Sequence, residues 1–271
     1  RRIKDDGLCG VGVWQGRSVR GEESQSIVLV GAGEAARLNG DRRLRRITTP
    51  RSDGLLLDLS KSEGWYDYDT LAALVQRAYT DKSWVRDAIE ETVAVFNRWK
   101  WKKPETSPTV VTGLVMATWI QSLWKWRPQV AIIGNSNSGK STAFTMLGGD
   151  KSSRGLFGNL ALMSSQSSEA GIRQAIKHDA SVLILDEFEN SKEREKVLNL
   201  FRTSSRGSKK LMGTSSQDGV SYGLSHIPWV AAIEVGLKRE PDRNRFIILE
   251  LDTPPESEFG KLVLPPESWL V

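Results

Sequence analysis

The amino-acid sequence predicts an α/β protein whose parallel sheet is covered by helices on both faces. In the second half of the chain, short apolar segments suited to buried strands alternate with segments of helical periodicity. The first of these strands runs into a glycine-bounded loop, and the second ends in two adjacent acids. The predicted strands cover residues 130–133, 182–185, 230–233 and 246–249.

The loop GNSNSGKS at 134–141 has the spacing G-x-x-x-x-G-K-S of a phosphate-binding loop. Glycine lets the backbone wrap closely round phosphate oxygens, and the N-terminus of the following helix favours anions. We expect Lys140 to reach the β- and γ-phosphates of ATP, and Ser141 to offer its hydroxyl to Mg²⁺. A Ser/Gly-rich loop with a chance lysine is the alternative, but it does not explain the flanking strand and helix. The expected nucleotide contacts are Gly134, Asn135, Ser136, Asn137, Ser138, Gly139, Lys140, Ser141 and Thr142.

The acidic pair Asp186 and Glu187 follows a wholly apolar strand of the kind that is buried on both faces. A carboxylate at this position holds Mg²⁺ in phosphate-binding-loop proteins, so we expect Asp186 to hold the metal. Glu187 is expected to polarise the attacking water as a general base. An ordinary acidic loop is the alternative. Two adjacent acids favour hydrolysis over nucleotide holding alone.

Composition places limits on the class of protein. With 271 residues, 39% of them hydrophobic and 26% charged, the chain suits a soluble globular protein. No apolar run approaches the roughly 20 residues of a membrane span, so we expect no membrane contact. The lone Cys9 suits a reducing compartment, and we expect a cytoplasmic protein. The chain opens without Met, so we expect it to be part of something longer.

We expect four parts along the chain: a β-rich segment at 1–62, a helical segment at 63–104, a P-loop domain at 105–255 and a tail at 256–271. In the first part, the run Gly31-Ala32-Gly33 after an apolar strand mimics a dinucleotide-binding fingerprint. A strand and turn are favoured, because Asn39-Gly40 would cut the helix that the fingerprint needs. Helices are predicted over 69–79, 83–99 and 110–124, with a linker at 103–108.

Basic and aromatic residues suggest a polyanionic partner. The net charge is +5 with a pI of about 9.3. Tryptophans interleaved with basic residues could stack bases, but packing of the rings in the core or at an interface is the favoured interpretation. Those tryptophans are Trp99, Trp101, Trp124 and Trp126. A basic run after the Asn39-Gly40 turn is either a solvated face or a contact for nucleic acid or another subunit: Arg42, Arg43, Arg45, Arg46 and Arg51.

Four strings carry a resemblance to a known family: WRP at 126–128, EAGIRQ at 169–174, LDEFE at 185–189 and DRNR at 242–245. They resemble the helicase module of primase-helicases from phages, plasmids and integrated elements. That module is an AAA+ ATPase similar to the superfamily 3 helicases. The match covers roughly residues 110–252, and the residues before about 60 resemble a β-rich domain of unknown function that often precedes the motor.

The resemblance implies a hexameric ring with ATP between subunits, completed by an arginine from the neighbour. Arg245 matches the expected position best and Arg243 second, with a basic turn as the alternative. Glu234 stands where the family places a polar amide that senses the γ-phosphate. This departure puts the sensor role in doubt.

The resemblance also implies a hairpin pointing into the channel of the ring. Arg206, Lys209 and Lys210 lie in the corresponding segment and would grip phosphates of single-stranded DNA without sequence preference. An exposed basic loop is the alternative.

Together these features predict an ATP-hydrolysing ring motor acting on DNA, the replicative helicase module of a mobile-element primase-helicase. The alternative is a nucleotide-gated assembly or remodelling ATPase, for example in defence, without unwinding activity. A metabolite kinase fits poorly, because no arginine-rich lid follows and the acidic pair suits attack by water.

Overall fold

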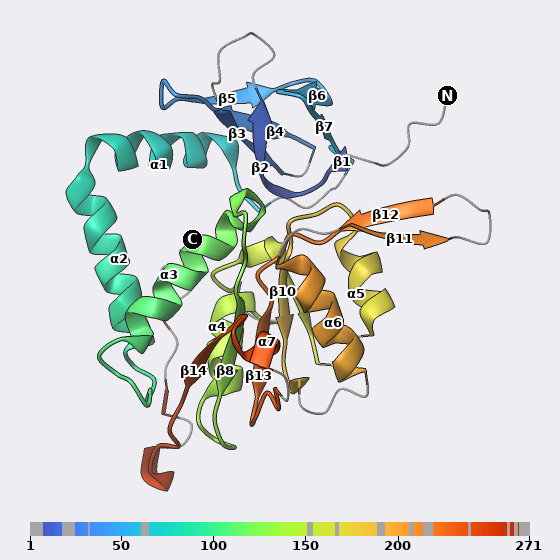
Figure 1. Cartoon of the computed structure of the whole chain (residues 1–271). Coiled ribbons are helices and arrows are strands. Elements are labelled where there is room, and N and C mark those ends of the chain that lie inside the picture. The colour runs from blue at the N-terminus through green and yellow to red at the C-terminus, as the bar shows by residue number, and fades with distance from the viewer. Residues whose placement is uncertain are drawn as a thin grey trace.

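A five-stranded parallel sheet forms the centre of the computed structural model (Figure 1). The strands lie in the order β14-β8-β13-β10-β9, and every neighbouring pair is parallel. The chain is therefore an α/β protein, as its sequence predicts. The strands are β8 (Gln129–Ile133), β9 (Ala161–Ser164), β10 (Val182–Leu185), β13 (Trp229–Ala232) and β14 (Phe246–Glu250). The structure describes residues 8–17, 25–31, 33–60, 65–150, 154–165, 168–188, 193–205, 209–213, 219–237, 240–258, 261–262 and 265.

Alternate residues of the central strands face two separate hydrophobic cores. In β8, Val130 and Ile132 join the core beneath α3 and α4, whereas Ala131 joins the core beneath α5 and α6. Because both faces of the sheet are buried, its inner strands need apolar residues at successive positions. The covering helices are α3 (Ser107–Trp119), α4 (Lys140–Gly148), α5 (Glu169–Ile176) and α6 (Arg194–Ser204), and a short α7 (Glu240–Arg243) precedes β14.

The N-terminal part contains a four-stranded antiparallel sheet in the order β2-β3-β4-β5 and a smaller sheet in the order β1-β7-β6. Val28 packs in a cluster with Leu57 of the smaller sheet, and Leu29 packs on the opposite face against Leu71 of α1. This part is β-rich, as predicted. The strands are β1 (Leu8–Cys9), β2 (Gly12–Arg17), β3 (Gln25–Val30), β4 (Ala35–Leu38), β5 (Leu44–Ile47), β6 (Arg51–Ser52) and β7 (Leu55–Leu57).

The apparent dinucleotide fingerprint lies at the connection between two antiparallel strands, β3 and β4. β3 ends at Val30, and the Gly31 N–H donates to the Glu34 carbonyl at 2.9 Å before β4 begins. The next turn has the Arg42 N–H donating to the Asn39 carbonyl at 2.9 Å, between β4 and β5. The prediction of strand and turn at both places is confirmed.

The helical segment forms α1 (Tyr68–Thr80) and α2 (Lys82–Phe96). Asp67 caps α1 by accepting from the Thr70 N–H at 2.9 Å, and Asp81 caps α2 by accepting from the Trp84 N–H at 3.0 Å. The prediction that α2 continues to Trp99 is wrong, because the chain turns after Phe96 and brings Trp99 into the core.

The segment that follows α2 forms backbone hydrogen bonds with the end of β14. Lys102 N–H donates to the Glu250 carbonyl at 2.9 Å, and Asp252 N–H donates to the Lys100 carbonyl at 2.7 Å. Trp99 and Trp101 are buried, whereas Trp124 and Trp126 are 45% and 47% exposed. Packing in the core is thus confirmed for Trp99 and Trp101, whereas packing of Trp124 and Trp126 at an interface stays a prediction.

The predicted helix at 110–124 begins earlier and ends earlier. Ser107 and Pro108 already belong to α3, where proline is tolerated because the first N–H groups of a helix have no partner. After Trp119 the chain forms a short 3-10 turn, η1 (Gln121–Leu123). The Gln121 side chain is buried and bonds the Ile227 N–H and the Ala180 carbonyl, which draws this turn away from the helix axis. No helix among the residues described is long and apolar enough to cross a membrane.

Candidate functional site

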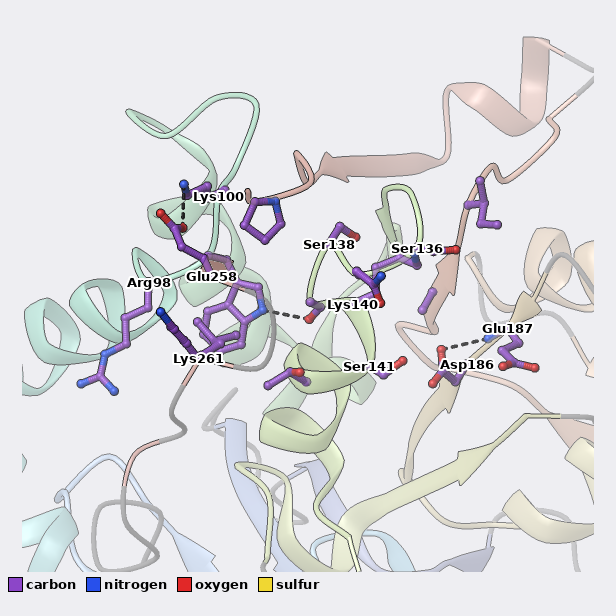
Figure 2. Close-up of a pocket in the computed structure, with 18 residues that line it drawn as sticks. Arg98, Lys100, Ser136, Ser138, Lys140, Ser141, Asp186, Glu187, Glu258 and Lys261 are labelled. Carbon is purple, nitrogen blue, oxygen red and sulfur yellow. Dashed lines mark hydrogen bonds and ion pairs between the residues drawn. The ribbon is translucent and has the colours of Figure 1, made fainter. Parts of the chain in front are cut away.

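A pocket of about 830 Å³ lies at the carboxyl ends of β8, β10 and β13 (Figure 2). β8 lies between β14 on one side and β13, β10 and β9 on the other. After β8 the chain crosses to β9, whereas after β13 it crosses back to β14, so the direction of the strand order reverses at β8. Ligands of open parallel sheets bind at such reversal points. One wall is the loop and helix start at 136–142, and a second wall contains Asp186, Glu187 and Ile233.

The glycines of the loop are required by its backbone. Gly139 has φ of +88°, in the left-handed region, and stands just before α4. A Cβ on Gly134 would lie 2.8 Å from the Leu251 carbonyl oxygen and 2.7 Å from Ser138 Oγ, closer than real contacts allow. Larger residues at these positions would therefore open the loop.

Hydrogen-bond donors gather at the start of α4. The first N–H groups of a helix have no partner inside it, and here they belong to Lys140, Ser141 and Thr142. Within the described residues Ser138 Oγ is buried and has no hydrogen-bond partner. The ammonium of Lys140 donates to the carbonyl oxygens of Gly134, at 2.5 Å, and Asn135, at 2.8 Å. This arrangement suits a polyanion such as a chain of phosphates.

The acidic pair lies opposite the helix start. Asp186 N–H donates to the Ser164 carbonyl at 3.0 Å, and Glu187 N–H donates to Asp186 Oδ1 at 2.9 Å. Figure 2 shows the Ser141 hydroxyl pointing toward Asp186, with Glu187 on the far side of that carboxylate. The next residue, Phe188, is buried and stacks on Phe201, which fixes the segment.

Glu187 has a backbone conformation that is unusual for its residue type. Its φ of +51° lies in the left-handed region, which costs a non-glycine residue of order 1 kcal/mol. Strained residues cluster at functional sites, because only a surrounding structure that over-determines them keeps them in place. The strained backbone of Glu187 is therefore typical of a residue at a functional site.

The set of ligands suits a nucleoside triphosphate with Mg²⁺. Bound with a nucleotide, Mg²⁺ takes one or two protein oxygens and fills its remaining positions with phosphate oxygens and water. Ser141 and Asp186 offer a hydroxyl and a carboxylate of this kind. In the part of the chain that the structure describes, no group of three or more His, Cys, Asp or Glu residues could hold a metal ion by itself.

The sequence did not predict the outer wall of the pocket. It is formed by Arg98, Trp99 and Lys100 after α2 and by the C-terminal residues Pro254, Glu258, Lys261 and Leu262. Lys100 Nζ and Glu258 Oε2 form an ion pair at 2.8 Å across the two segments. Trp99 Nε1 donates to the carbonyl oxygen of Gly139 at 2.9 Å. No motif marks these residues, and the aromatic and basic run around Trp99 is their one signal in the sequence.

The two candidate arginines do not line this pocket. Arg243 is exposed, and its Nε donates to the Leu237 carbonyl at 3.0 Å. Arg245 lies 4.0 Å from the carboxylate of Asp242, which is buried and also held by Arg202. The hydrogen bond to Asp242 raises the pKa of Arg202.

Glu234 is also outside the pocket. The neighbouring Ile233 lines it, but Glu234 lines a separate hollow of about 430 Å³ together with Arg243. Glu234, at the expected sensor position, therefore lines the same hollow as Arg243 and not the pocket that holds the phosphate-binding loop.

The candidate DNA-binding segment forms an antiparallel hairpin of β11 (Lys209–Gly213) and β12 (Gly219–Gly223). Figure 1 shows the hairpin projecting from the body of the protein. Lys209 and Lys210 are the first two residues of β11. Arg206 lies outside the described residues.

Comparisons with known proteins find only distant similarity. No family model matches the chain, and no curated protein matches it. Among solved structures, it is similar to the apo structure of the NrS-1 C-terminal region, with 12% identity and a TM-score of 0.41, over 93% of this chain and 63% of that one. The A-form apo structure of the same region gives 13% identity and a TM-score of 0.35, over 65% and 41%. The chain thus spans less than two thirds of these structures.

Proposed function

We propose that this chain is an ATP-hydrolysing motor of the AAA+ class that acts on single-stranded DNA as a ring. One observation carries the proposal: the loop before α4 and the Asp186-Glu187 pair line the same pocket. The fit of the glycine backbone, the orphaned Ser138 hydroxyl and the Lys140 ammonium to phosphates supports ATP as the ligand.

The residues of the pocket divide the chemistry between them. The N–H groups at the start of α4 and Lys140 bind and orient the phosphates. Ser141 and Asp186 would hold Mg²⁺, which supplies positive charge to the phosphate oxygens. Glu187 accepts the proton of the attacking water as a general base. The apolar residues behind the acids, such as Phe188, limit how far the carboxylates can move.

A neighbouring copy of the chain would complete the site. Neither Arg243 nor Arg245 lines the pocket of its own chain, which is what a residue acting on the next subunit requires. Arg243 is the more exposed of the two, and Arg245 has Asp242 beside it. We therefore propose both as candidates for the arginine that stabilises charge on the transferred phosphoryl group.

Mixing inactive variants tests the shared site. Lys140→Ala subunits should bind ATP weakly but keep their arginines, and Arg243→Ala or Arg245→Ala subunits keep their own nucleotide pockets. Mixing the two inactive proteins should restore part of the ATPase activity at interfaces that join a good pocket to a good arginine. A mixture no more active than its separate components would contradict sharing of the site.

The hairpin of β11 and β12 is the proposed contact for DNA. Replacing Lys209 and Lys210 by glutamate should abolish stimulation of ATPase activity by single-stranded DNA, while basal activity remains. A matched control replaces Lys82 and Arg86, which are exposed on α2, by glutamate. Equal loss in both double variants would show a general charge effect instead of a hairpin contact.

The second candidate function is a nucleotide-gated assembly or remodelling ATPase without unwinding activity, for example in defence. Arg243 and Arg245 lie outside the pocket of their own chain, which suits an assembly of this kind as well as a ring motor, so ring formation alone does not separate the two functions. Wild-type protein should hydrolyse ATP faster with single-stranded DNA and displace a paired strand. ATP-dependent assembly without DNA stimulation or strand displacement would favour the second candidate.

A further inference from the structure

Trp99 contacts the phosphate-binding loop from outside the sequence motif. Its side chain is 4% exposed, and its indole N–H donates to the carbonyl oxygen of Gly139 at 2.9 Å, across 40 positions of the sequence (dashed in Figure 2). The Trp99 ring also occupies the space beside the Gly139 Cα. A Cβ on Gly139 would lie 3.2 Å from Trp99 Cδ1 and Nε1. Trp99 therefore fits against both the carbonyl and the bare α-carbon of this glycine.

The Gly139 carbonyl oxygen accepts two hydrogen bonds. One comes from Trp99, and the other from the Ala143 N–H at 3.0 Å in the first turn of α4. A carbonyl oxygen has two lone pairs, so both are used. The two donors come from different elements, and together they fix the plane of the peptide that joins Gly139 to Lys140.

The orientation of that peptide decides where a phosphate donor points. In a planar trans peptide the C=O and N–H bonds point in opposite directions. Because Gly139 C=O points along α4 and toward Trp99, the N–H of Lys140 points the other way, out of the N-terminus of α4. This N–H belongs to the first residue of α4, which lines the pocket.

We propose that Trp99 is a positioning residue for nucleotide binding: it holds the Gly139 carbonyl so that the Lys140 N–H is aimed at a phosphate oxygen. The inference rests on the proposed function of the pocket. Trp99 acts through Gly139 and does not take part in the chemistry. It lies directly after α2, so it also ties the end of the helical segment to the loop.

Trp99 also packs in the core, and a test must separate this from positioning. Its ring lies tilted against that of Phe96, with ring centroids 6.0 Å apart. Trp101 offers a matched control, because it is 3% exposed, belongs to the same core and donates its indole N–H to the Phe96 carbonyl at 2.7 Å. Trp101 does not line the pocket. Replacing either tryptophan by phenylalanine removes one indole donor and similar apolar volume.

The experiment compares Trp99→Phe with Trp101→Phe. Melting temperature reports the structural loss, calorimetry gives the Kd of Mg-ADP, and steady-state assays give kcat and KM for ATP. We expect similar losses of melting temperature in both variants. Only Trp99→Phe should raise the Kd of Mg-ADP and the KM, by about fivefold to tenfold, the effect of one misaligned hydrogen bond. Its kcat should stay within about twofold of wild type, since Glu187 is untouched.

Equal changes of the Kd of Mg-ADP in the two variants, or no change in Trp99→Phe, would overturn the inference. The proposed function would still stand if the wild-type protein binds Mg-ADP. A wild-type protein that binds no Mg-ADP would overturn the proposed function itself. If Trp99→Phe does not fold, NMR spectra of the indole ¹⁵N–H groups in the wild-type protein provide the test instead. Adding Mg-ADP should shift the Trp99 indole resonance and leave that of Trp101 in place; an unmoved Trp99 resonance would contradict the inference.

Discussion

The ammonium nitrogen of Lys140 lies 2.5 Å from the carbonyl oxygen of Gly134, so the first glycine of the loop binds the tip of the lysine side chain. A second carbonyl, that of Asn135, accepts from the same ammonium at 2.8 Å. Two carbonyl dipoles of the loop thus hold the ammonium group at the wall of the pocket.

Replacing Lys140 by alanine should weaken ATP binding about 100-fold, because a charge-assisted hydrogen bond to phosphate is lost. Calorimetry with Mg-ATP measures this directly. Lys125→Ala removes an exposed lysine outside the pocket and serves as the control. Equal affinity of Lys140→Ala and wild type would mean that phosphates bind elsewhere.

The Lys100–Glu258 ion pair places one positive and one negative charge at the outer wall of the pocket. Both side chains are 47% exposed, so the pair contributes little to stability. Its effect should appear in nucleotide binding, since Glu258→Gln removes a negative charge that repels phosphates and frees Lys100. We expect a Kd for Mg-ADP about twofold to fivefold lower at low ionic strength, with the gain lost near 1 M salt.

The pair between Lys102 and Glu250 is the matched control for this change. It joins the same two segments, but neither residue lines the pocket. The hydrogen bond to Glu250 raises the pKa of Lys102. Glu250→Gln should leave the Kd of Mg-ADP unchanged. If both substitutions tightened binding equally, the long-range charge of the whole protein would be the cause.

His226 predicts a loss of stability in acid. The ring is fully buried, and its Nδ1 accepts from the Ser225 N–H at 3.1 Å. The proton of the neutral ring therefore lies on Nε2, which is 3.0 Å from the Asp179 carbonyl oxygen. The pKa of His226 is lowered to about 4, chiefly by burial; the hydrogen bond to the Asp179 carbonyl opposes this shift, and the charge of the nearby Arg127 adds to it.

The unfolded chain binds a proton at His226 near pH 6.5, whereas the folded chain does so only near pH 4, so the unfolded state takes up more protons as the pH falls between these values. Stability should fall across this window by up to about 3 kcal/mol from this group. Urea unfolding at several pH values measures it. His226→Gln should flatten the dependence. Equal slopes for His226→Gln and wild type would contradict this assignment.

The sequence predicts well those parts of the site that are formed by neighbouring residues. The strand at β8, the loop and the start of α4 follow one another, so apolar runs, glycines and Lys140 mark them directly. The acids at the end of β10 are marked in the same way. The parallel order of the strands then brings the loop and the acids to one edge of the sheet.

The outer wall could not be predicted, because it depends on pairing between segments that are distant in sequence. Trp99 and Lys100 reach the pocket only because the chain after α2 pairs with the end of β14. Composition does not separate Trp101, which is buried, from Trp126, which is exposed in a similar basic setting. The tertiary contacts decide which aromatic side chain enters the core.

The central claim is that Glu187 activates the water that splits ATP. The most direct test measures binding and turnover of Mg-ATP by Glu187→Gln, which keeps the shape of the side chain and removes its basicity. The account predicts a Kd within about threefold of wild type and a kcat lower by roughly 100-fold or more. Turnover at the wild-type rate in this variant would contradict it.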